Sequence, residues 1–195
     1  LDGVFRNAVN RTFNRITIDG DMSTNDTALL LSPDSDRPLS EKDDLGSFAK
    51  ALEETLYDLA VMLVSDGEGA TKLVTVRVIG AQNDADAAKA ARAVAQSLLV
   101  KTAFFGNDPN WGRIGAAAGY SGAALDEKRL SIYYGDVPLL IRGVPQKQDQ
   151  KALAPILAGR EFTVTVDIGL GNAESTMLTT DISYEYVKIN AEYTT

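Results

Sequence analysis

Alternating apolar and polar side chains mark the strands of this chain. The clearest case is 161–168, and 72–80 follows the same rule. A period of two residues puts every second side chain on one face, which is typical of a half-buried strand. Two further strands are predicted at 130–134 and 137–142, and the Gly135-Asp136 pair between them favours a tight hairpin.

Apolar residues that recur every three or four positions predict the helices. The longest such helix covers 43–64, and it leads into a glycine-flanked acidic loop. Two polar segments, 32–42 and 104–112, read as loops because Pro, Asp, Asn, Ser and Gly accumulate there. The other predicted helices are 1–16, 84–101, 114–120 and 148–157, and the other predicted strands are 14–18, 27–31 and 175–190, the last as one long or two shorter strands.

Mixed strands, hairpins and helices in this order indicate an α+β fold. We expect a layered mixed α/β sandwich, with several hairpin-connected strands and flanking helices. The chain has 195 residues and shows no repeat or linker, so a single domain over 1–195 is the simplest organisation. Its apolar content of 45% and charged content of 24% are ordinary for a soluble globular protein.

Charge and hydropathy narrow the class of partner. The net charge of −8 argues against nucleic acid, because a polyphosphate partner requires a basic face. The chain starts with no signal-peptide pattern, and it holds no apolar run long enough to span a bilayer. We therefore expect a cytoplasmic protein with no membrane partner.

The missing residue types limit the chemistry. The chain has no His and no Cys. It alone cannot supply a Ser-His triad, a thiol nucleophile or the usual zinc ligands, so no metal site is predicted. Chemistry in this chain must use carboxylates, hydroxyls, amines, backbone amides or groups from another chain.

Three short segments resemble ligand-binding motifs, but each lacks a residue that its motif requires. Residues 19–25 have the alternating oxygen ligands of a calcium loop, but Thr24 and Leu30 stand where the turn glycine and the bidentate glutamate belong. Residues 67–72 lack the ending of a phosphate loop, and 169–171 lack the third glycine of a dinucleotide fingerprint. What remains is Glu68 between two glycines, either an exposed loop residue or a carboxylate placed for close approach to a ligand.

Aromatic residues give weaker signals. Trp111, the single tryptophan, lies in the loop 106–113, and we favour a role in anchoring that loop to the core over a role in a binding cleft. Tyr184, Tyr186 and Tyr193 could stack against bases. Tyr184 and Tyr186 share one face of the predicted strand, so packing explains them at least as well.

Four polar segments together resemble the β chain of the bifunctional ornithine acetyltransferase (glutamate N-acetyltransferase) family of arginine biosynthesis. They span nearly the whole chain in the family's order. They are Phe13-Asn14-Arg15-Ile16-Thr17-Ile18-Asp19-Gly20-Asp21 with Ser23-Thr24-Asn25-Asp26, then Asp66-Gly67-Glu68-Gly69-Ala70-Thr71-Lys72, then Asn107-Asp108-Pro109-Asn110-Trp111-Gly112-Arg113, and the ending 184–195.

The resemblance implies an enzyme that moves an acetyl group from N-acetylornithine to glutamate through an acetyl-threonine intermediate. In this family the precursor cuts itself ahead of the nucleophilic Thr, and the free amine can serve as the local base. We expect that Thr upstream of Leu1, so no catalytic residue is assigned within 1–195. The resemblance also implies an α chain from the same precursor, an α2β2 heterotetramer and no cofactor.

Three substrate-binding residues follow from the resemblance: Glu68, Asn190 and Thr195. Ornithine and glutamate share an amino-acid head that bears an ammonium and a carboxylate. A carboxylate such as Glu68 can pair with the ammonium, while amide and hydroxyl donors can hold the carboxylate. Which residue contacts which group is left open.

Two alternatives to the acetyltransferase stay open. A related N-terminal-nucleophile amidohydrolase or aminopeptidase would pass the acyl group to water. A non-catalytic partner subunit is the second alternative, because the chain opens with Leu1 instead of a nucleophile.

Overall fold

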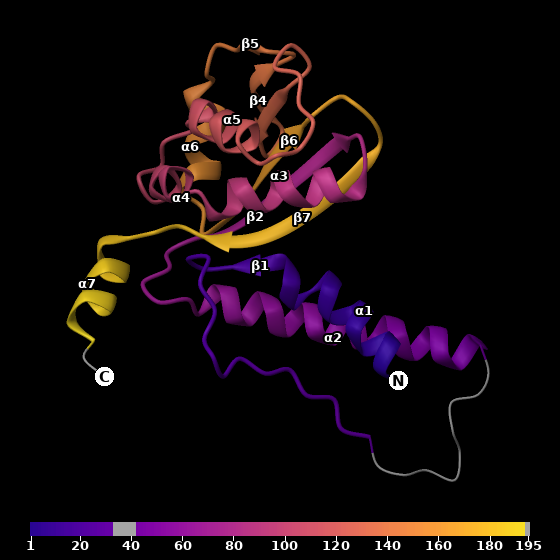
Figure 1. Cartoon of the computed structure of the whole chain (residues 1–195). Coiled ribbons are helices and arrows are strands. Elements are labelled where there is room, and N and C mark those ends of the chain that lie inside the picture. The colour runs from indigo at the N-terminus through magenta and orange to yellow at the C-terminus, as the bar shows by residue number, and fades with distance from the viewer. Residues whose placement is uncertain (33–41, 194–195) are drawn as a thin grey trace.

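A seven-stranded mixed sheet forms the centre of the computed structural model, which describes residues 1–32 and 42–193 (Figure 1). The strand order is β1-β7-β2-β6-β3-β4-β5. The β1–β7 and β2–β6 pairs are parallel and the other pairs are antiparallel. The strands are β1 (Ile16–Thr17), β2 (Leu73–Ala81), β3 (Ser131–Tyr134), β4 (Val137–Ile141), β5 (Val144–Pro145), β6 (Glu161–Asp167) and β7 (Ala173–Thr180).

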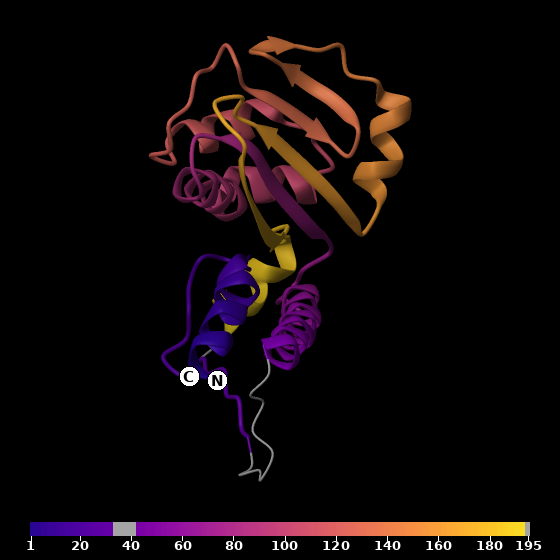
Figure 2. The ribbon, with the colours of Figure 1, turned by 90° about the vertical axis from the view of Figure 1, so that its right-hand side faces the viewer.

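Helices flank the sheet. α3, α4, α5 and α6 contribute to one large core with the strands, while α1 and α2 form a separate layer beneath β1 (Figures 1 and 2). The helices are α1 (Asp2–Arg11), the short 3-10 helix η1 (Phe13–Arg15), α2 (Lys42–Ser65), α3 (Asp84–Gln96), α4 (Leu98–Phe105), α5 (Trp111–Gly119), α6 (Gln150–Ala158) and α7 (Tyr184–Glu192). This arrangement confirms the expected α+β layered class.

Strand alternation decides which core each side chain enters. Val74, Val76 and Val78 of β2 are fully buried in the main cluster under α3. Leu73 and Leu178 belong instead to a second cluster with Val64 of α2. The ends of β2 and β7 therefore connect the sheet to the α2 layer.

The first predicted helix ends earlier than the spacing suggests. α1 stops at Arg11, and Thr12 takes φ −121° and ψ −86°. The Thr12 hydroxyl donates to the carbonyl of Ala8 across 2.8 Å, a bond that offers the backbone an alternative to continuing the helix. A turn of 3-10 helix follows, and only Ile16–Thr17 remains of the strand predicted at 14–18.

The Ala-rich helix predicted at 84–101 is two helices. Ser97 adopts extended backbone angles, φ −66° and ψ 115°, and its hydroxyl accepts a bond from the amide of Val100 at 3.4 Å. Ser97 therefore ends α3 and caps α4. Downstream, α5 begins at Trp111, three residues before the predicted helix, because the Asn110 side chain accepts from the amide of Arg113 at 3.1 Å.

Two strand predictions are wrong. Residues 27–31 form no strand, since no strand in the described part of the chain pairs with them. The segment predicted as strand over 175–190 is β7 followed by α7. Ser183 caps α7 by accepting from the amide of Tyr186 at 3.2 Å, and Glu185 lies in the first turn, where the helix dipole favours an acidic residue. Tyr184 and Tyr186 therefore lie on a helix.

Candidate functional site

The Glu68 loop is a tight turn between α2 and β2. The amide of Gly67 donates to the carbonyl of Val64 at 3.2 Å, and the amide of Ala70 donates to the carbonyl of Gly67 at 3.0 Å. Gly69 has φ +64°, a conformation that favours glycine. A Cβ on Gly69 would lie 2.4 Å from the amide nitrogen of Tyr186, so only glycine lets this loop approach the start of α7 so closely.

A buried carboxylate fixes the end of this loop. Asp181 is only 3% exposed, and it follows the last residue of β7. One of its oxygens accepts from the amides of Thr71 and Lys72 at 2.8 and 2.9 Å, and the other accepts from the Thr71 hydroxyl. Asp181 thus joins the segment that leads into β2 to the segment that leads into α7.

Glu68 and Asn190, two of the three predicted substrate-binding residues, lie side by side. The Asn190 side-chain amide donates to Glu68 Oε2 across 2.8 Å and to the carbonyl of Tyr186 across 3.0 Å. Both side chains are exposed, which leaves them open to a ligand. Thr195, the third predicted residue, lies outside the described residues.

The acidic turn after β1 reaches the same site. The Tyr186 hydroxyl donates to Asp19 Oδ2 across 3.0 Å. Partial burial, this hydrogen bond and the charges of Asp19, Asp21 and Glu68 together raise the pKa of Tyr186 to about 12. The phenol is therefore protonated at neutral pH, and it remains a donor to Asp19. Nothing in the order of these residues along the chain predicts the contact.

A buried lysine lies behind the site. Lys101 is fully buried in α4, and its ammonium donates to Thr179 Oγ1 at 2.8 Å and to the carbonyl of Thr180. Burial lowers the pKa of Lys101 to about 7, although the charges of Asp181 and Asp19 act in the opposite direction. No sequence pattern predicts this burial, because Lys101 is the last residue of the helix predicted at 84–101, where a lysine is ordinary.

Trp111, the first residue of α5, helps to anchor the start of this helix. Trp111 is partly buried and packs against the main core, as predicted. Arg113 donates to the carbonyl of Leu99 at 2.8 Å, which ties the start of α5 to α4. At the end of α4, the Phe105 ring meets Tyr184 edge-on, with ring centroids 5.4 Å apart. This contact is the aromatic link between α4 and α7.

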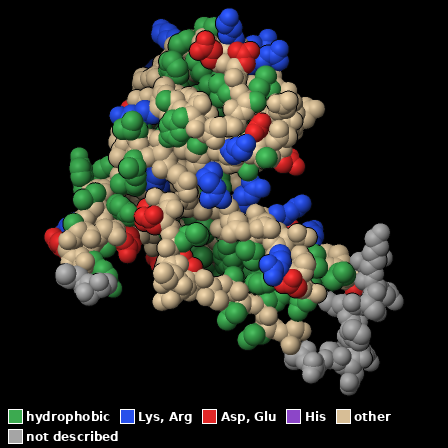
Figure 3. All heavy atoms as spheres, viewed as in Figure 1, with side chains coloured by type: hydrophobic (Ala, Val, Ile, Leu, Met, Phe, Trp, Pro, Cys, Tyr) green, Lys and Arg blue, Asp and Glu red, His purple; other side chains and the backbone are tan. Residues whose placement is uncertain are grey.

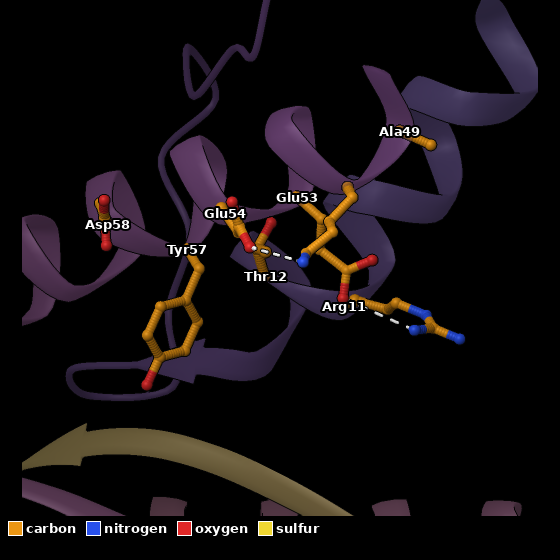
Figure 4. Close-up of a pocket in the computed structure, with 8 residues that line it drawn as sticks. Arg11, Thr12, Ala49, Glu53, Glu54, Tyr57 and Asp58 are labelled. Atoms are coloured by element: carbon orange, nitrogen blue, oxygen red, sulfur yellow. Dashed lines mark ion pairs between the residues drawn. The ribbon is translucent and has the colours of Figure 1, made fainter. Parts of the chain in front are cut away.

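A pocket of about 530 Å³ lies elsewhere, between α1 and α2 (Figure 4). Its lining includes two exposed ion pairs, Lys50 with Glu54 and Arg11 with Glu53. Neither Glu68 nor Asn190 lines it. We base the candidate site on the Glu68–Asn190 contact, because an open groove that is lined by solvated ion pairs has no convergent set of ligand-binding groups.

Within residues 1–32 and 42–193, no group of three or more acidic, His or Cys side chains could hold a metal ion. No helix in the same ranges is both long and apolar enough to cross a bilayer.

Known proteins match this chain along its whole length. The chain is 53% identical to the "Arginine biosynthesis bifunctional protein ArgJ" of Geobacter sulfurreducens and 44% identical to the "Glutamate N-acetyltransferase" of Methanosarcina acetivorans, each match covering 100% of the chain and 51% of the relative. It therefore spans about half the length of the curated relatives it matches. A crystal structure of the protein named ArgJ from Bacillus halodurans shares 37% identity and a TM-score of 0.86, covering 98% of this chain and 92% of that one.

The family model described as the ArgJ family matches residues 1–195. Together with the relatives' identity and the shared fold, this match shows that the chain belongs to the ArgJ family.

Proposed function

We propose that this chain is the substrate-holding half of an acetyltransferase that moves an acetyl group from N-acetylornithine to glutamate in arginine biosynthesis. The names of the relatives support this activity. The observation that carries it to this chain is the 2.8 Å contact between Asn190 and Glu68. It brings together two groups that suit an amino-acid ligand.

The proposed chemistry has two steps. The hydroxyl of a Thr upstream of Leu1 attacks the acetyl carbonyl of N-acetylornithine, the C–N bond breaks, and ornithine leaves with the proton. The amine of glutamate then attacks the acetyl-threonine ester, which yields N-acetylglutamate and the free hydroxyl. Covalent catalysis of this kind divides one difficult transfer into two easier ones.

In this proposal, Glu68 and Asn190 hold the acetyl donor, N-acetylornithine, by its charged groups. The Glu68 carboxylate pairs with the side-chain ammonium of N-acetylornithine, whose α-nitrogen carries the acetyl group, and charge-assisted hydrogen bonds of this type are the stronger kind. The Asn190 amide donates to Glu68 in the free chain. It can donate instead to a substrate carboxylate once Glu68 has an ammonium partner. The Thr195 hydroxyl is proposed as a further donor to that carboxylate.

A partner chain completes this site in the proposal. The α chain cut from the same precursor is the proposed partner, and two such pairs form the α2β2 enzyme in the cytoplasm. Apolar side chains gather on the face over α1, α2 and the segment that follows β1 (Figure 3). Met22, Leu29 and Leu31 on that segment are 77–89% exposed. Exposed apolar groups of this extent favour an interface.

An acetyl-transfer assay on the complete enzyme tests the proposal. The enzyme is supplied with N-acetylornithine and glutamate, and N-acetylglutamate and acetate are measured separately. We expect N-acetylglutamate as the main product. Acetate without N-acetylglutamate would indicate an amidohydrolase instead, and release of neither would favour a non-catalytic subunit. The intact mass of the native chain shows whether a Thr precedes Leu1.

A further inference from the structure

Three residues of the segment 181–190 make polar contacts with the Glu68 loop, in antiparallel order. Asp181 binds Thr71 and Lys72, the Ser183 hydroxyl donates to the carbonyl of Gly69 at 2.6 Å, and Asn190 donates to Glu68. One segment runs from Lys72 back to Glu68 while the other runs forward from Asp181 to Asn190. We call these contacts the loop–helix ladder.

The ladder extends the pairing of β2 and β7 beyond the last residue of β7. In the β2–β7 pair, Leu73 lies opposite Thr180, the last residue of β7. The next pair of positions is Lys72 and Asp181, where the Asp181 carboxylate accepts the Lys72 amide in place of a backbone carbonyl. This first contact is therefore attached directly to the rigid core of the sheet, where Val74 and Val76 are fully buried.

α7 has little apolar packing of its own. None of its nine residues is buried, and Tyr184 and Val187 are 84% and 57% exposed. A nine-residue helix is marginal in water unless packing stabilises it. The polar and ring contacts that hold it to the rest of the described chain are the ladder, the Tyr186–Asp19 bond and the edge of the Phe105 ring. The position of Asn190 therefore depends on polar contacts. The contact of Asp181 with the Lys72 amide is the buried one among them.

We propose that Asp181 is a positioning residue for the acetyl-transfer site: through Thr71 it sets the distance between Glu68 and Asn190. The proposal rests on the proposed function, since it concerns how that same site binds N-acetylornithine. Asp181 itself touches no substrate. Its two oxygens accept three donors from the Glu68 loop, and it precedes the Ser183 cap of α7 by two residues.

Thr71→Val gives the sharpest test. Thr71 is exposed, and valine keeps its shape while removing the hydroxyl that donates to Asp181, so the fold is retained. The variant is made in the complete enzyme. We expect the KM for N-acetylornithine to rise about fivefold with kcat little changed, because one hydrogen bond to a charged group is lost. Amide hydrogen exchange across α7 is expected to accelerate to a similar extent.

Two further variants separate positioning from a general structural effect. Thr71→Ser restores the hydroxyl and is expected to return both KM and α7 exchange to wild-type values. Thr55→Val is the matched control, because Thr55 is an exposed threonine whose hydroxyl donates only to the carbonyl of Ala51 within α2. It is expected to change neither quantity.

Asp181→Asn supplies the second measurement. Asparagine keeps one side-chain oxygen that can accept from the backbone amides of Thr71 and Lys72. It loses the negative charge and the second oxygen that accepts from the Thr71 hydroxyl. We expect a rise in KM at least as large as for Thr71→Val. If both variants keep the wild-type KM, or change α7 exchange without changing KM, Asp181 is not a positioning residue. If the wild-type enzyme transfers no acetyl group, the proposed function is refuted instead. Amide hydrogen exchange of α7 would then still show whether Asp181 stabilises the ladder.

Discussion

The side-chain amide of Asn190 donates to the carboxylate of Glu68 across 2.8 Å, although 122 residues separate the two in the chain. Both groups are exposed, and each belongs to an element with little packing of its own. An exposed pair of this kind adds little to stability. It does place an acceptor and a donor within reach of one amino-acid ligand.

Glu68→Gln tests the charge at the site. The amide can still accept from Asn190, but it cannot pair as an anion with a substrate ammonium. We expect kcat/KM for N-acetylornithine to fall about 10- to 100-fold, the range for a lost hydrogen bond to a charged group. The melting temperature is expected to stay constant because Glu68 is exposed. Steady-state kinetics of the complete enzyme provide the measurement, with Glu127→Gln as an exposed control far along the chain.

Coupling between Glu68 and Asn190 can be measured in a double-mutant cycle. Alanine at each position alone removes the 2.8 Å bond, so the double variant loses it only once. We expect the two effects on log kcat/KM to be less than additive, with a coupling of about 0.5–1.5 kcal/mol. Strict additivity would mean that the contact has no role in the reaction.

The substrate-binding role of Glu68 and Asn190 stays a prediction, although the structure places the two side chains in contact. The resemblance named Glu68 and Asn190, yet the strand prediction over 175–190 put Asn190 in the wrong kind of element. The strand pattern of Ser175–Thr180 does not continue to residue 190, because Ser183 caps a helix. The strands 72–80 and 161–168 were predicted correctly because their alternating valines face one buried core.

Long-range polar contacts were beyond sequence reasoning. Asp181 meets Thr71 across 110 residues, and Tyr186 meets Asp19 across 167. Neither periodicity nor composition encodes such pairings, because they depend on how β7 and β2 align in the sheet. The predicted strand at 27–31 was wrong for a similar reason. An apolar run indicates a strand only if another strand is available to pair with it.

Gly69→Ala tests the close approach of the loop to α7. The new Cβ would lie 2.4 Å from the amide nitrogen of Tyr186, and a φ of +64° is strained for alanine. We expect a loss of about 1–2 kcal/mol in local stability, a displaced α7 and a raised KM. Hydrogen exchange of α7 amides and steady-state kinetics provide the measurements. Gly46→Ala is the control: it lies in α2 with nothing within 4 Å of the new Cβ, and it is expected to stabilise the helix.

The buried Lys101 predicts how stability depends on pH. Its pKa is about 7 in the folded chain, against an ordinary value of 10.5. Between these two values the unfolded chain binds more protons at this group, so its contribution to folding stability rises as pH increases from 7 toward 10.5. Below pH 7 the lysine is protonated in both states, and its contribution no longer changes with pH.

Lys101→Met removes this titration. As pH rises from 7 to 9, we expect the melting temperature of the wild-type enzyme to increase by roughly 2–4 °C relative to the variant. Calorimetry at a series of pH values checks this, and Lys128→Met, at an exposed lysine, is expected to follow the wild type. A difference between wild type and Lys101→Met that stays constant from pH 7 to 9 would show that Lys101 keeps an ordinary pKa. Its ammonium would then be charged against Thr179 and the carbonyl of Thr180 throughout that range.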